Sequence, residues 1–339
     1  MIDFTVGDVS GSQTLTDNDH IYPGHINELR TAINTVNTQI VNVKNYGATG
    51  DAVTDDTVAI QAAITANAGN YLFFPPGYYL ISSPLIATST TCVNFKGVGT
   101  PSSIYSHGDH AMLQFDTSVG DIYYADVDGL NFYNDCSGVR TSAIGINVQG
   151  TGNFYRYKFR NNHFRGTYTG IMIQALSGGW GEFSNMIWDN VGGNSNEYGI
   201  FWKPTNGGQA IYNNLRIMVS ATGTGIVMQT NFGDFTITGC IFAGGTQCIL
   251  LDGGAALYKN NFSITGNKFD ETTKPVNVIN CSAFRILGNS YCGGLTHAVT
   301  VDSDCTDYVI DEGGTNHMEG TRQTGTMGVG SSNGEATFG

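Results

Sequence analysis

Gly145-Ile-Asn-Val-Gln149 is the first of seven short segments with the pattern small residue, apolar, any residue, apolar, polar. The other six are Gly170-Ile-Met-Ile-Gln174, Gly199-Ile-Phe-Trp-Lys203, Gly225-Ile-Val-Met-Gln229, Cys248-Ile-Leu-Leu-Asp252, Pro275-Val-Asn-Val-Ile279 and Ala298-Val-Thr-Val-Asp302. Their first residues lie 25, 29, 26, 23, 27 and 23 positions apart. A period of about 25 with two or three short strands per repeat is typical of a β-solenoid, in which each coil buries its apolar face against the next.

The alternation within these segments predicts which side chains face the core. Residues of one parity along a strand share a face, so the second residue of each copy should point inward. We therefore expect one buried column of Ile146, Ile171, Ile200, Ile226 and Ile249. The recurrent Gly and Asn residues suit corners that need positive φ.

A second set of segments interleaves with the first and supports the same period. Its members are Val127–Phe132, Phe159–Phe164, Phe235–Cys240, Phe262–Asn267 and Phe284–Asn289. A Greek-key sandwich is the alternative all-β fold, but it would not place aligned columns at one fixed period. Leucine-rich and helical repeats are excluded because no helix-period stretch occupies these coils.

Composition limits the class of partner. The 339 residues include 46 glycines, and 15 basic against 28 acidic residues give a net charge of −13, which argues against nucleic acid and anionic membranes as partners. No apolar run approaches 18 residues, so we expect no membrane insertion, and the N-terminus lacks the basic and apolar regions of a secretory signal. Seven cysteines without CxxC pairs fit free thiols in the core better than a disulfide or metal set. We expect no metal and no cofactor.

The texture of the sequence changes upstream of the repeats. A 3-4-3-4 spacing of apolar residues predicts a short helical seam, which favours three strands if it forms a coiled coil. A monomeric amphipathic helix that caps the solenoid explains the same spacing. The seam residues are Ile26, Leu29, Ile33, Val36 and Ile40.

A second helix and two strands are predicted between the seam and the repeats. Polar capping residues open the segment Thr54–Ile64, and Ile60, Ala63 and Ile64 share one face of it. Residues 71–74 and 78–81 are predicted strands around the turn Pro75-Pro-Gly77.

Three blocks in this region resemble the pectate-lyase-like superfamily found in phage tailspikes: Asn45-Tyr-Gly-Ala-Thr-Gly-Asp51, Thr54-Asp-Asp-Thr-Val-Ala-Ile-Gln-Ala-Ala-Ile64 and Tyr71-Leu-Phe-Phe-Pro-Pro-Gly-Tyr-Tyr-Leu-Ile81. The resemblance implies an all-β fold, a right-handed single-stranded parallel β-helix. It also implies a homotrimer on a phage virion, assembled in the host cytoplasm and joined to other tail proteins through its N-terminus. The chain lacks the Asn-Thr-Asp and Gly-His-Gly motifs of polygalacturonases, so pectin is not the expected substrate.

With this resemblance the chain divides into four parts. They are an N-terminal attachment segment and helical neck (1–41), a pectate-lyase-like module with a capping helix (42–90), the parallel β-helix (91–312), and a glycine-rich C-terminal extension (313–339).

Two groups of acids invite a chemical role that local structure explains equally well. Asp51, Asp55 and Asp56 lie at a turn and a helix start, where a carboxylate accepts backbone N–H groups. The segment Asp302–Asp307 resembles part of a calcium loop but lacks its glycine and distal glutamate. We expect structural roles for both groups.

A basic and aromatic stretch between residues 154 and 168 is a candidate substrate-binding site. Strand alternation places Arg156, Lys158 and Arg160 on one face and Tyr155, Tyr157 and Phe159 on the other. Guanidinium groups bind carboxylates in a fork, so outward basic and aromatic groups suit an acidic sugar. Salt bridges to acidic neighbours on adjacent coils are the alternative.

The segment 180–203 combines carboxylates with all three tryptophans. Glycosidic hydrolysis needs two carboxyl groups, one as acid and one ionised, and aromatic walls that hold the sugar. The candidate catalytic residues are Glu182 as acid, with Asp189 or Glu197 as base or nucleophile. Trp180, in a glycine loop, and Tyr198 are candidate sugar contacts, whereas alignment with Val148 and Ile173 places Trp202 in the core.

His163 is a further candidate for contact with substrate. With Arg160, Arg165 and Tyr168 nearby in sequence it would suit an eliminase, although a histidine between asparagines is often only a turn residue. Taken with the resemblance, which implies a phage tail spike or fibre protein, these features predict that the protein binds host surface or capsular polysaccharide and cleaves it, by hydrolysis rather than elimination. The alternatives are a virion protein that binds without catalysis and a secreted bacterial lyase.

Overall fold

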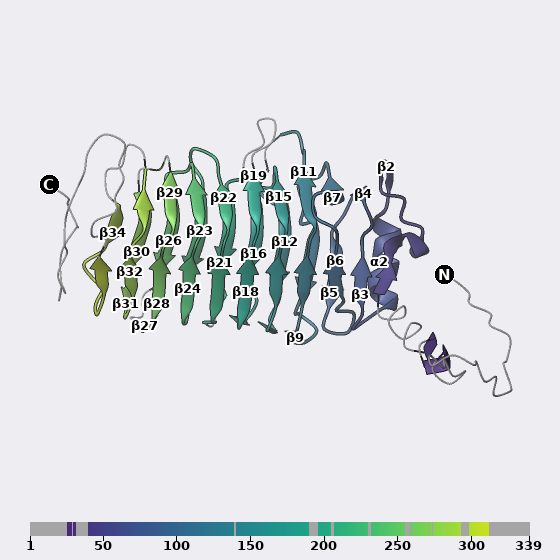
Figure 1. Cartoon of the computed structure of the whole chain (residues 1–339), viewed down its shortest axis with the longest axis horizontal. Coiled ribbons are helices and arrows are strands. Elements are labelled where there is room, and N and C mark those ends of the chain that lie inside the picture. The colour runs from purple at the N-terminus through teal and green to yellow at the C-terminus, as the bar shows by residue number, and fades with distance from the viewer. Residues whose placement is uncertain are drawn as a thin grey trace, which may run out of the picture.

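The computed structural model describes residues 26–28, 30–31, 40–138, 140–189, 196–204, 207–229, 232–254, 258–259, 261–270, 272, 274–292 and 298–311. These residues form a right-handed parallel β-helix, whose coils stack along one long axis (Figure 1). Three long parallel sheets, here called A, B and C, run the length of the solenoid and enclose one continuous apolar core.

Each coil contributes one strand to each long sheet. Sheet A consists of β1 (Ile40–Asn42), β3 (Tyr71–Phe73), β6 (Asn94–Lys96), β10 (Asp126–Asp128), β14 (Lys158–Arg160), β18 (Gly181–Ser184), β21 (Ala210–Asn213), β24 (Phe235–Thr238), β28 (Phe262–Thr265), β32 (Arg285–Leu287) and β35 (Val309–Asp311). Sheet B consists of β2 (Asp51–Asp55), β4 (Gly77–Leu80), β7 (Ser102–Ser106), β11 (Asn131–Asn134), β15 (His163–Arg165), β19 (Ile187–Asp189), β22 (Arg216–Met218), β25 (Ile241–Ala243), β29 (Lys268–Asp270) and β33 (Ser290–Tyr291). Sheet C consists of β5 (Leu85–Thr88), β8 (Leu113–Asp116), β12 (Ile144–Gln149), β16 (Thr169–Ile173), β20 (Tyr198–Trp202), β23 (Thr224–Gln229), β26 (Gln247–Asp252), β30 (Lys274–Ile279) and β34 (Val299–Val301).

Two short sheets complete the coils between sheets C and A. One, sheet D, joins β9 (Ile122–Tyr123), β13 (Asn153–Tyr155) and β17 (Ser177–Gly179). The other joins β27 (Tyr258–Lys259) and β31 (Cys281–Ser282).

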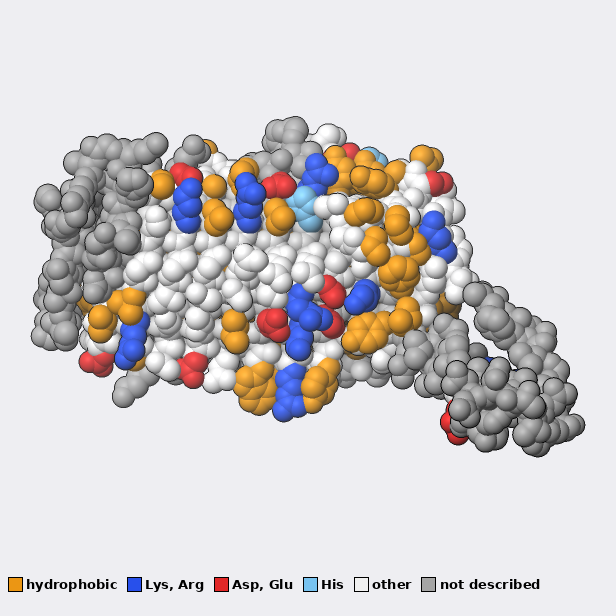
Figure 2. Space-filling model, viewed as in Figure 1, with side chains coloured by type: hydrophobic (Ala, Val, Ile, Leu, Met, Phe, Trp, Pro, Cys, Tyr) orange, Lys and Arg blue, Asp and Glu red, His pale blue; other side chains and the backbone are white. Residues whose placement is uncertain are grey.

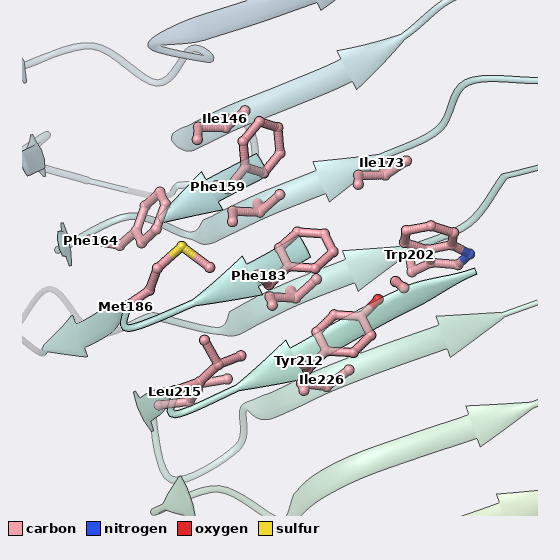
Figure 3. Close-up of a cluster of buried hydrophobic side chains, with 14 of the residues drawn as sticks. Ile146, Phe159, Phe164, Ile173, Phe183, Met186, Trp202, Tyr212, Leu215 and Ile226 are labelled. Atoms are coloured by element: carbon pink, nitrogen blue, oxygen red, sulfur yellow. The ribbon is translucent and has the colours of Figure 1, made fainter. Parts of the chain in front are cut away.

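The predicted inward column is confirmed. Ile146 pairs with Ile171, Ile171 with Ile200, Ile200 with Ile226 and Ile226 with Ile249, and all five side chains are fully buried in sheet C. Figure 3 shows part of this core, where Ile146, Ile173 and Ile226 lie among the aromatic rings of Phe159, Phe183 and Tyr212.

The glycines that begin the repeats lie within strands of sheet C, not at corners. A Cβ on Gly170 would lie 1.8 Å from Nε1 of the buried Trp188 and 2.7 Å from the carbonyl oxygen of Gly199. Gly145, Gly199 and Gly225 meet similar obstacles from sheet B side chains and the next coil. Close packing between sheets B and C therefore requires the small residue that marks the period. The corners between sheets A and B do use Gly and Asn with positive φ, as predicted, for example Asn185 and Gly239.

The second set of segments was aligned correctly from Val127 to Phe159 and from Phe235 through Phe262 to Phe284, but the two groups are offset by two residues. Phe159 pairs with Phe183, Phe183 with Tyr212 and Tyr212 with Ile237, so Phe235 precedes this column by two positions. Phe235 instead stacks on Phe262, at 4.8 Å between ring centroids. Both positions face inward, so the alternation was right while the alignment was not.

The first coil confirms the predicted helix and strands. Helix α2 (Thr57–Ala66) begins three residues later than expected, because β2 extends through Asp55, and its Ile60, Ala63 and Ile64 are fully buried. A one-turn 3-10 helix, η1 (Val43–Tyr46), links β1 to β2. Buried Asp56 accepts the N–H groups of Thr49 at 2.7 Å and Gly50 at 2.9 Å, a structural role for this carboxylate.

The helical seam is only partly visible. Residues 26–28 and 30–31 are helical, but Ile40 belongs to strand β1, which pairs with Tyr71–Phe73, so its place in the seam was wrong. Leu29, Ile33 and Val36 lie outside the described residues, as does the extension 313–339.

Cys240, Cys248, Cys281 and Cys305 are buried thiols, which confirms the predicted role of cysteines in the core. No helix among the described residues is long and apolar enough to cross a membrane.

Candidate functional site

A row of exposed side chains lies at the turn between sheet D and sheet A. Tyr124, Arg156 and Trp180 each occupy the position after the sheet D strand of three successive coils. The N–H of Tyr124 donates to the carbonyl of Tyr155 at 3.1 Å, and that of Arg156 donates to Gly179 at 3.0 Å. All three residues have left-handed backbone, with φ of 64°, 57° and 52°. We call this row the Tyr–Arg–Trp ladder.

The side chains of the ladder contact one another across the coils. The Arg156 guanidinium lies 5.3 Å from the ring centroid of Tyr124 and 5.1 Å from that of Trp180, and it also donates to the Tyr124 hydroxyl. Tyr124 is 62% exposed and Trp180 is 57% exposed, so the ladder presents aromatic surface and one cation to solvent. Figure 2 shows apolar and basic side chains projecting together from the lower edge of the body.

Polar groups extend the ladder towards the C-terminal coils. Trp180 Nε1 donates to Oε1 of Gln209 at 2.7 Å, and Gln209 Nε2 donates to Asp234 at 3.1 Å. On the other side, the ring of Tyr155 lies 5.8 Å from that of Trp180, and its hydroxyl donates to Ser177. Trp180 is therefore held in a fixed orientation although more than half of it is exposed.

The alternation predicted for the basic row at 156–160 is confirmed only from Tyr157 to Arg160. Lys158 is exposed and Tyr157 and Phe159 are fully buried. Arg160 contacts Asp126 at 2.8 Å and Asp128 at 3.9 Å, and burial raises the pKa of Asp126 although Arg160 opposes this. The salt-bridge interpretation therefore holds for Arg160.

Arg156 and Tyr155 depart from the predicted alternation. Arg156 lies in the left-handed turn before β14, and Tyr155 is partly exposed beside Trp180 instead of buried with Tyr157. No carboxylate among the described residues lies within ion-pair distance of Arg156.

The three candidate catalytic carboxylates lie on three different sheets. Glu182 is in β18 of sheet A and accepts from Ser184 at 3.0 Å. Asp189 ends β19 of sheet B and contacts Nε2 of His163 at 2.8 Å. Glu197 precedes β20 of sheet C and accepts from Ser220 at 2.5 Å and Thr222 at 3.1 Å. Each carboxylate thus has its own partners, and the fold brings Asp189 together with His163 instead of with Glu182.

His163 is more than a turn residue, because it lies in a strand of sheet B and its Nε2 is hydrogen-bonded to Asp189. Burial lowers its pKa, while the hydrogen bond to Asp189 acts in the opposite direction. Of the residues that we grouped with His163, only Arg165 lies on sheet B with it, because Arg160 lies on sheet A.

The remaining aromatic candidates are less exposed than Trp180. Trp202 is buried in register with Ile173, as predicted, and Trp188 is buried against Phe164. Tyr198 is partly buried and packs against Tyr168 and Phe201 at the start of a sheet C strand.

Sequence analysis missed Tyr124 and Gln209. The sheet D strand Ile122–Tyr123 and the left-handed Tyr124 precede the copies that we aligned, and Gln209 lies between the aligned copies 199–203 and 225–229. The sequence signal for Tyr124 is its spacing of 32 residues from Arg156, one coil length.

Solved structures with the same fold include two phage tailspikes. The enzymatically active domain of tailspike protein 2 of bacteriophage CBA120 has a TM-score of 0.55 at 14% identity, over 81% of this chain and 41% of that one. The tailspike protein of Acinetobacter baumannii phage AM24 has a TM-score of 0.53 at 14% identity, over 83% of this chain and 55% of that one.

Among curated proteins, the non-secreted LysM effector LysM19 of Penicillium expansum is 33% identical over 191 aligned residues. The match covers 46% of this chain and 14% of that protein, so this chain spans only a small part of the relative. The family model for rhamnogalacturonase A/epimerase, pectate lyase-like, matches residues 40–250, which is more than half of the chain. Fold and family match agree, and the chain therefore belongs to the rhamnogalacturonase A/epimerase, pectate lyase-like family.

Proposed function

We propose that this chain is the β-helical body of a phage tail spike or fibre protein, which binds host surface polysaccharide at the Tyr–Arg–Trp ladder. The observation that carries the proposal is the stack of Tyr124, Arg156 and Trp180 on three successive coils, exposed and fixed by mutual contacts. The family match and the fold shared with two phage tailspikes support polysaccharide as the ligand and the virion as the location of the protein.

The geometry of the ladder suits a sugar chain that runs along the solenoid axis. Neighbouring parallel strands lie about 4.8 Å apart, so such a chain meets one side chain of the ladder on each coil. Aromatic side chains offer apolar faces with polar edges, and Arg156 and Gln209 add hydrogen-bonding groups between and beside the rings. The ladder therefore supplies both apolar contact and directed polar contact along one line.

A binding assay with purified host capsular polysaccharide tests this proposal. Trp180→Ala should weaken binding at least tenfold, which corresponds to a loss of about 1.4 kcal/mol of contact energy. Tyr71→Ala is the matched control. Tyr71 is an exposed aromatic residue, as Trp180 is, but it lies in a strand of sheet A outside the ladder. If both variants bind like the wild type, the ladder is not the binding site.

Cleavage of the bound chain is the finer part of the proposal. Glu182 is the proposed acid, since it follows the ladder residue Trp180 by two positions on β18. Asp189 or Glu197 is the proposed base or nucleophile. Glycosidase carboxylates lie about 5–5.5 Å apart for retention and about 6.5–9.5 Å apart for inversion, and the placement of the three groups on three sheets makes binding without catalysis the main alternative.

The release of reducing ends from the polysaccharide measures hydrolysis, and the absorbance of an unsaturated uronate measures elimination. Glu182→Gln keeps the shape of the side chain and removes its proton, so turnover should fall about a hundredfold or more while binding remains. Turnover that is unchanged would exclude Glu182 as the acid. If the wild type releases neither product, the non-catalytic virion protein is the better description.

Assembly is also proposed rather than observed. We propose that the chain forms a homotrimer through the seam around Ile33 and joins other tail proteins through residues 1–41. The change Ile33→Asp would place like charges at the three-fold axis, and light scattering should then report monomers.

A further inference from the structure

A second row of side chains lies on sheet B, away from the Tyr–Arg–Trp ladder. The register places Tyr105 beside Tyr133 and Tyr133 beside Arg165 on β7, β11 and β15. The two tyrosine rings stack with centroids 5.1 Å apart and planes 15° apart. The Arg165 guanidinium lies 5.3 Å from the centroid of Tyr133, so an aromatic support orients it.

Arg165 differs from Arg160 in its electrostatic environment. Arg160 on sheet A is held by Asp126 and Asp128, whereas no carboxylate of the described residues lies within ion-pair distance of Arg165. Asp189 is its neighbour in register, but that carboxylate contacts His163 at 2.8 Å. In a chain with a net charge of −13, an oriented guanidinium is thus left without an anion.

Two buried polar atoms beside this row also lack partners. Nε of Arg165 and Nδ1 of His163 are shielded from solvent, and neither has a hydrogen-bond partner in the described structure. A buried donor without an acceptor is destabilising, so such atoms call for a functional explanation. The side chains around Arg165 therefore do not saturate its hydrogen-bonding capacity, and the residue as a whole is only half-buried.

We propose that Arg165, supported on Tyr133, is a second binding site, which takes an oxyanion group carried on a sugar: a carboxylate, a sulfate or a phosphate. A planar guanidinium binds two oxygens of such a group in parallel and is less strongly hydrated than an ammonium group. The site lies on sheet B, so it is separate from the ladder. The oxyanion follows from Arg165 itself, whereas the sugar that carries it rests on the proposed function.

Asp189 modulates this site through its charge. It is the residue in register with Arg165 on the next coil, so a bound oxyanion would lie near a carboxylate of the same sign. Removing that charge should therefore strengthen binding, whereas removing the charge of Arg165 should weaken it. Opposite effects at two adjacent positions are not expected from a loss of folding.

The experiment uses the full chain with ¹³C-labelled tyrosine rings, titrated in NMR with glucuronate, glucose 6-sulfate, glucose 6-phosphate and glucose. At least one of the three anionic sugars should shift tyrosine resonances, and the anion that does so identifies the group; glucose should not. Arg165→Gln should weaken binding about tenfold or more, and Asp189→Asn should strengthen it a few-fold. Arg216→Gln removes an exposed arginine two coils further along sheet B and should leave the affinity unchanged.

Three results would overturn the proposal: no response to any anionic sugar, equal binding by wild type and Arg165→Gln, or an equal loss in Arg216→Gln, which indicates attraction by charge alone. Trp180→Ala separates the two sites. If that variant loses capsular polysaccharide but retains the anionic sugar, the sheet B site is independent of the ladder.

Discussion

The substitution Gly170→Ala tests the packing that gives this chain its repeat. Gly170 lies in β16, and a Cβ at this position would be 1.8 Å from Nε1 of Trp188, 2.6 Å from Cδ1 of the same ring and 2.7 Å from the carbonyl oxygen of Gly199. The indole would have to retreat by about 1.6 Å to restore a 3.4 Å contact. It has no free space for this, because it is fully buried and stacks on Phe164 at 4.9 Å.

The expected cost is at the upper end of the range for overpacking, about 3 kcal/mol, since neither obstacle is the end of a flexible side chain. Gly178→Ala is the matched control. Gly178 is also a buried strand glycine, but its Cβ would meet Trp202 at 3.1 Å and Ile173 at 3.3 Å, contacts that small shifts relieve. We expect a cost of about 1 kcal/mol or less for the control.

Thermal and denaturant unfolding of both variants, followed by circular dichroism, measure the difference. A double-mutant cycle with Trp188→Leu tests whether the indole ring causes this cost. Gly170→Ala should be less destabilising when the indole ring is absent. If Gly170→Ala is no more destabilising than Gly178→Ala, the close approach of sheets B and C does not explain the glycine of the repeat.

Two further predictions concern the core and the response to acid. Ile200→Ala should lower the free energy of unfolding by about 2–5 kcal/mol in denaturant titrations, because it leaves a cavity in a fully buried column. Hydrogen bonds from Ser82 and Thr57 lower the pKa of Asp55, so its stabilising contribution is present above the unfolded pKa of about 3.9 and is lost as the pH falls through the lower folded pKa. Melting temperatures should therefore fall below about pH 4, and less steeply in Asp55→Asn than in the wild type.

The fold could be predicted because the solenoid repeats one constraint many times. The inward isoleucines from Ile146 to Ile249 follow the same alternation of apolar residues on every coil. The alternation is a weak signal in one strand, but here five coils repeat it. The same redundancy allowed the error at Phe235, since a shift of two residues keeps every side chain on its face. Strand pairing, which is non-local, was needed to detect it.

The candidate site was less predictable because it depends on turns and on contacts between coils. Trp180 was identified from its glycine-rich surroundings, and its exposure is confirmed. Tyr124, which contacts the same guanidinium of Arg156, lies two coils earlier, where no local motif marks it. The pairing of Asp189 with His163 likewise follows from register between β15 and β19, which the unequal coil lengths hide in the sequence.

The choice of residues at left-handed positions separates ordinary corners from the ladder. At the corner between sheets A and B, successive coils use Asn161, Asn185, Asn214 and Gly239, which adopt positive φ at low cost. At the turn between sheets D and A the same conformation is adopted by Tyr124, Arg156 and Trp180, bulky residues for which it costs about 1–2 kcal/mol each. In later coils, the left-handed positions before sheet A strands are occupied by the smaller residues Ala283 and Asp307. Packing against the core does not require large side chains there, because they are exposed and contact mainly one another. The strain in the middle coils is therefore an argument in favour of the binding site proposed for these three residues.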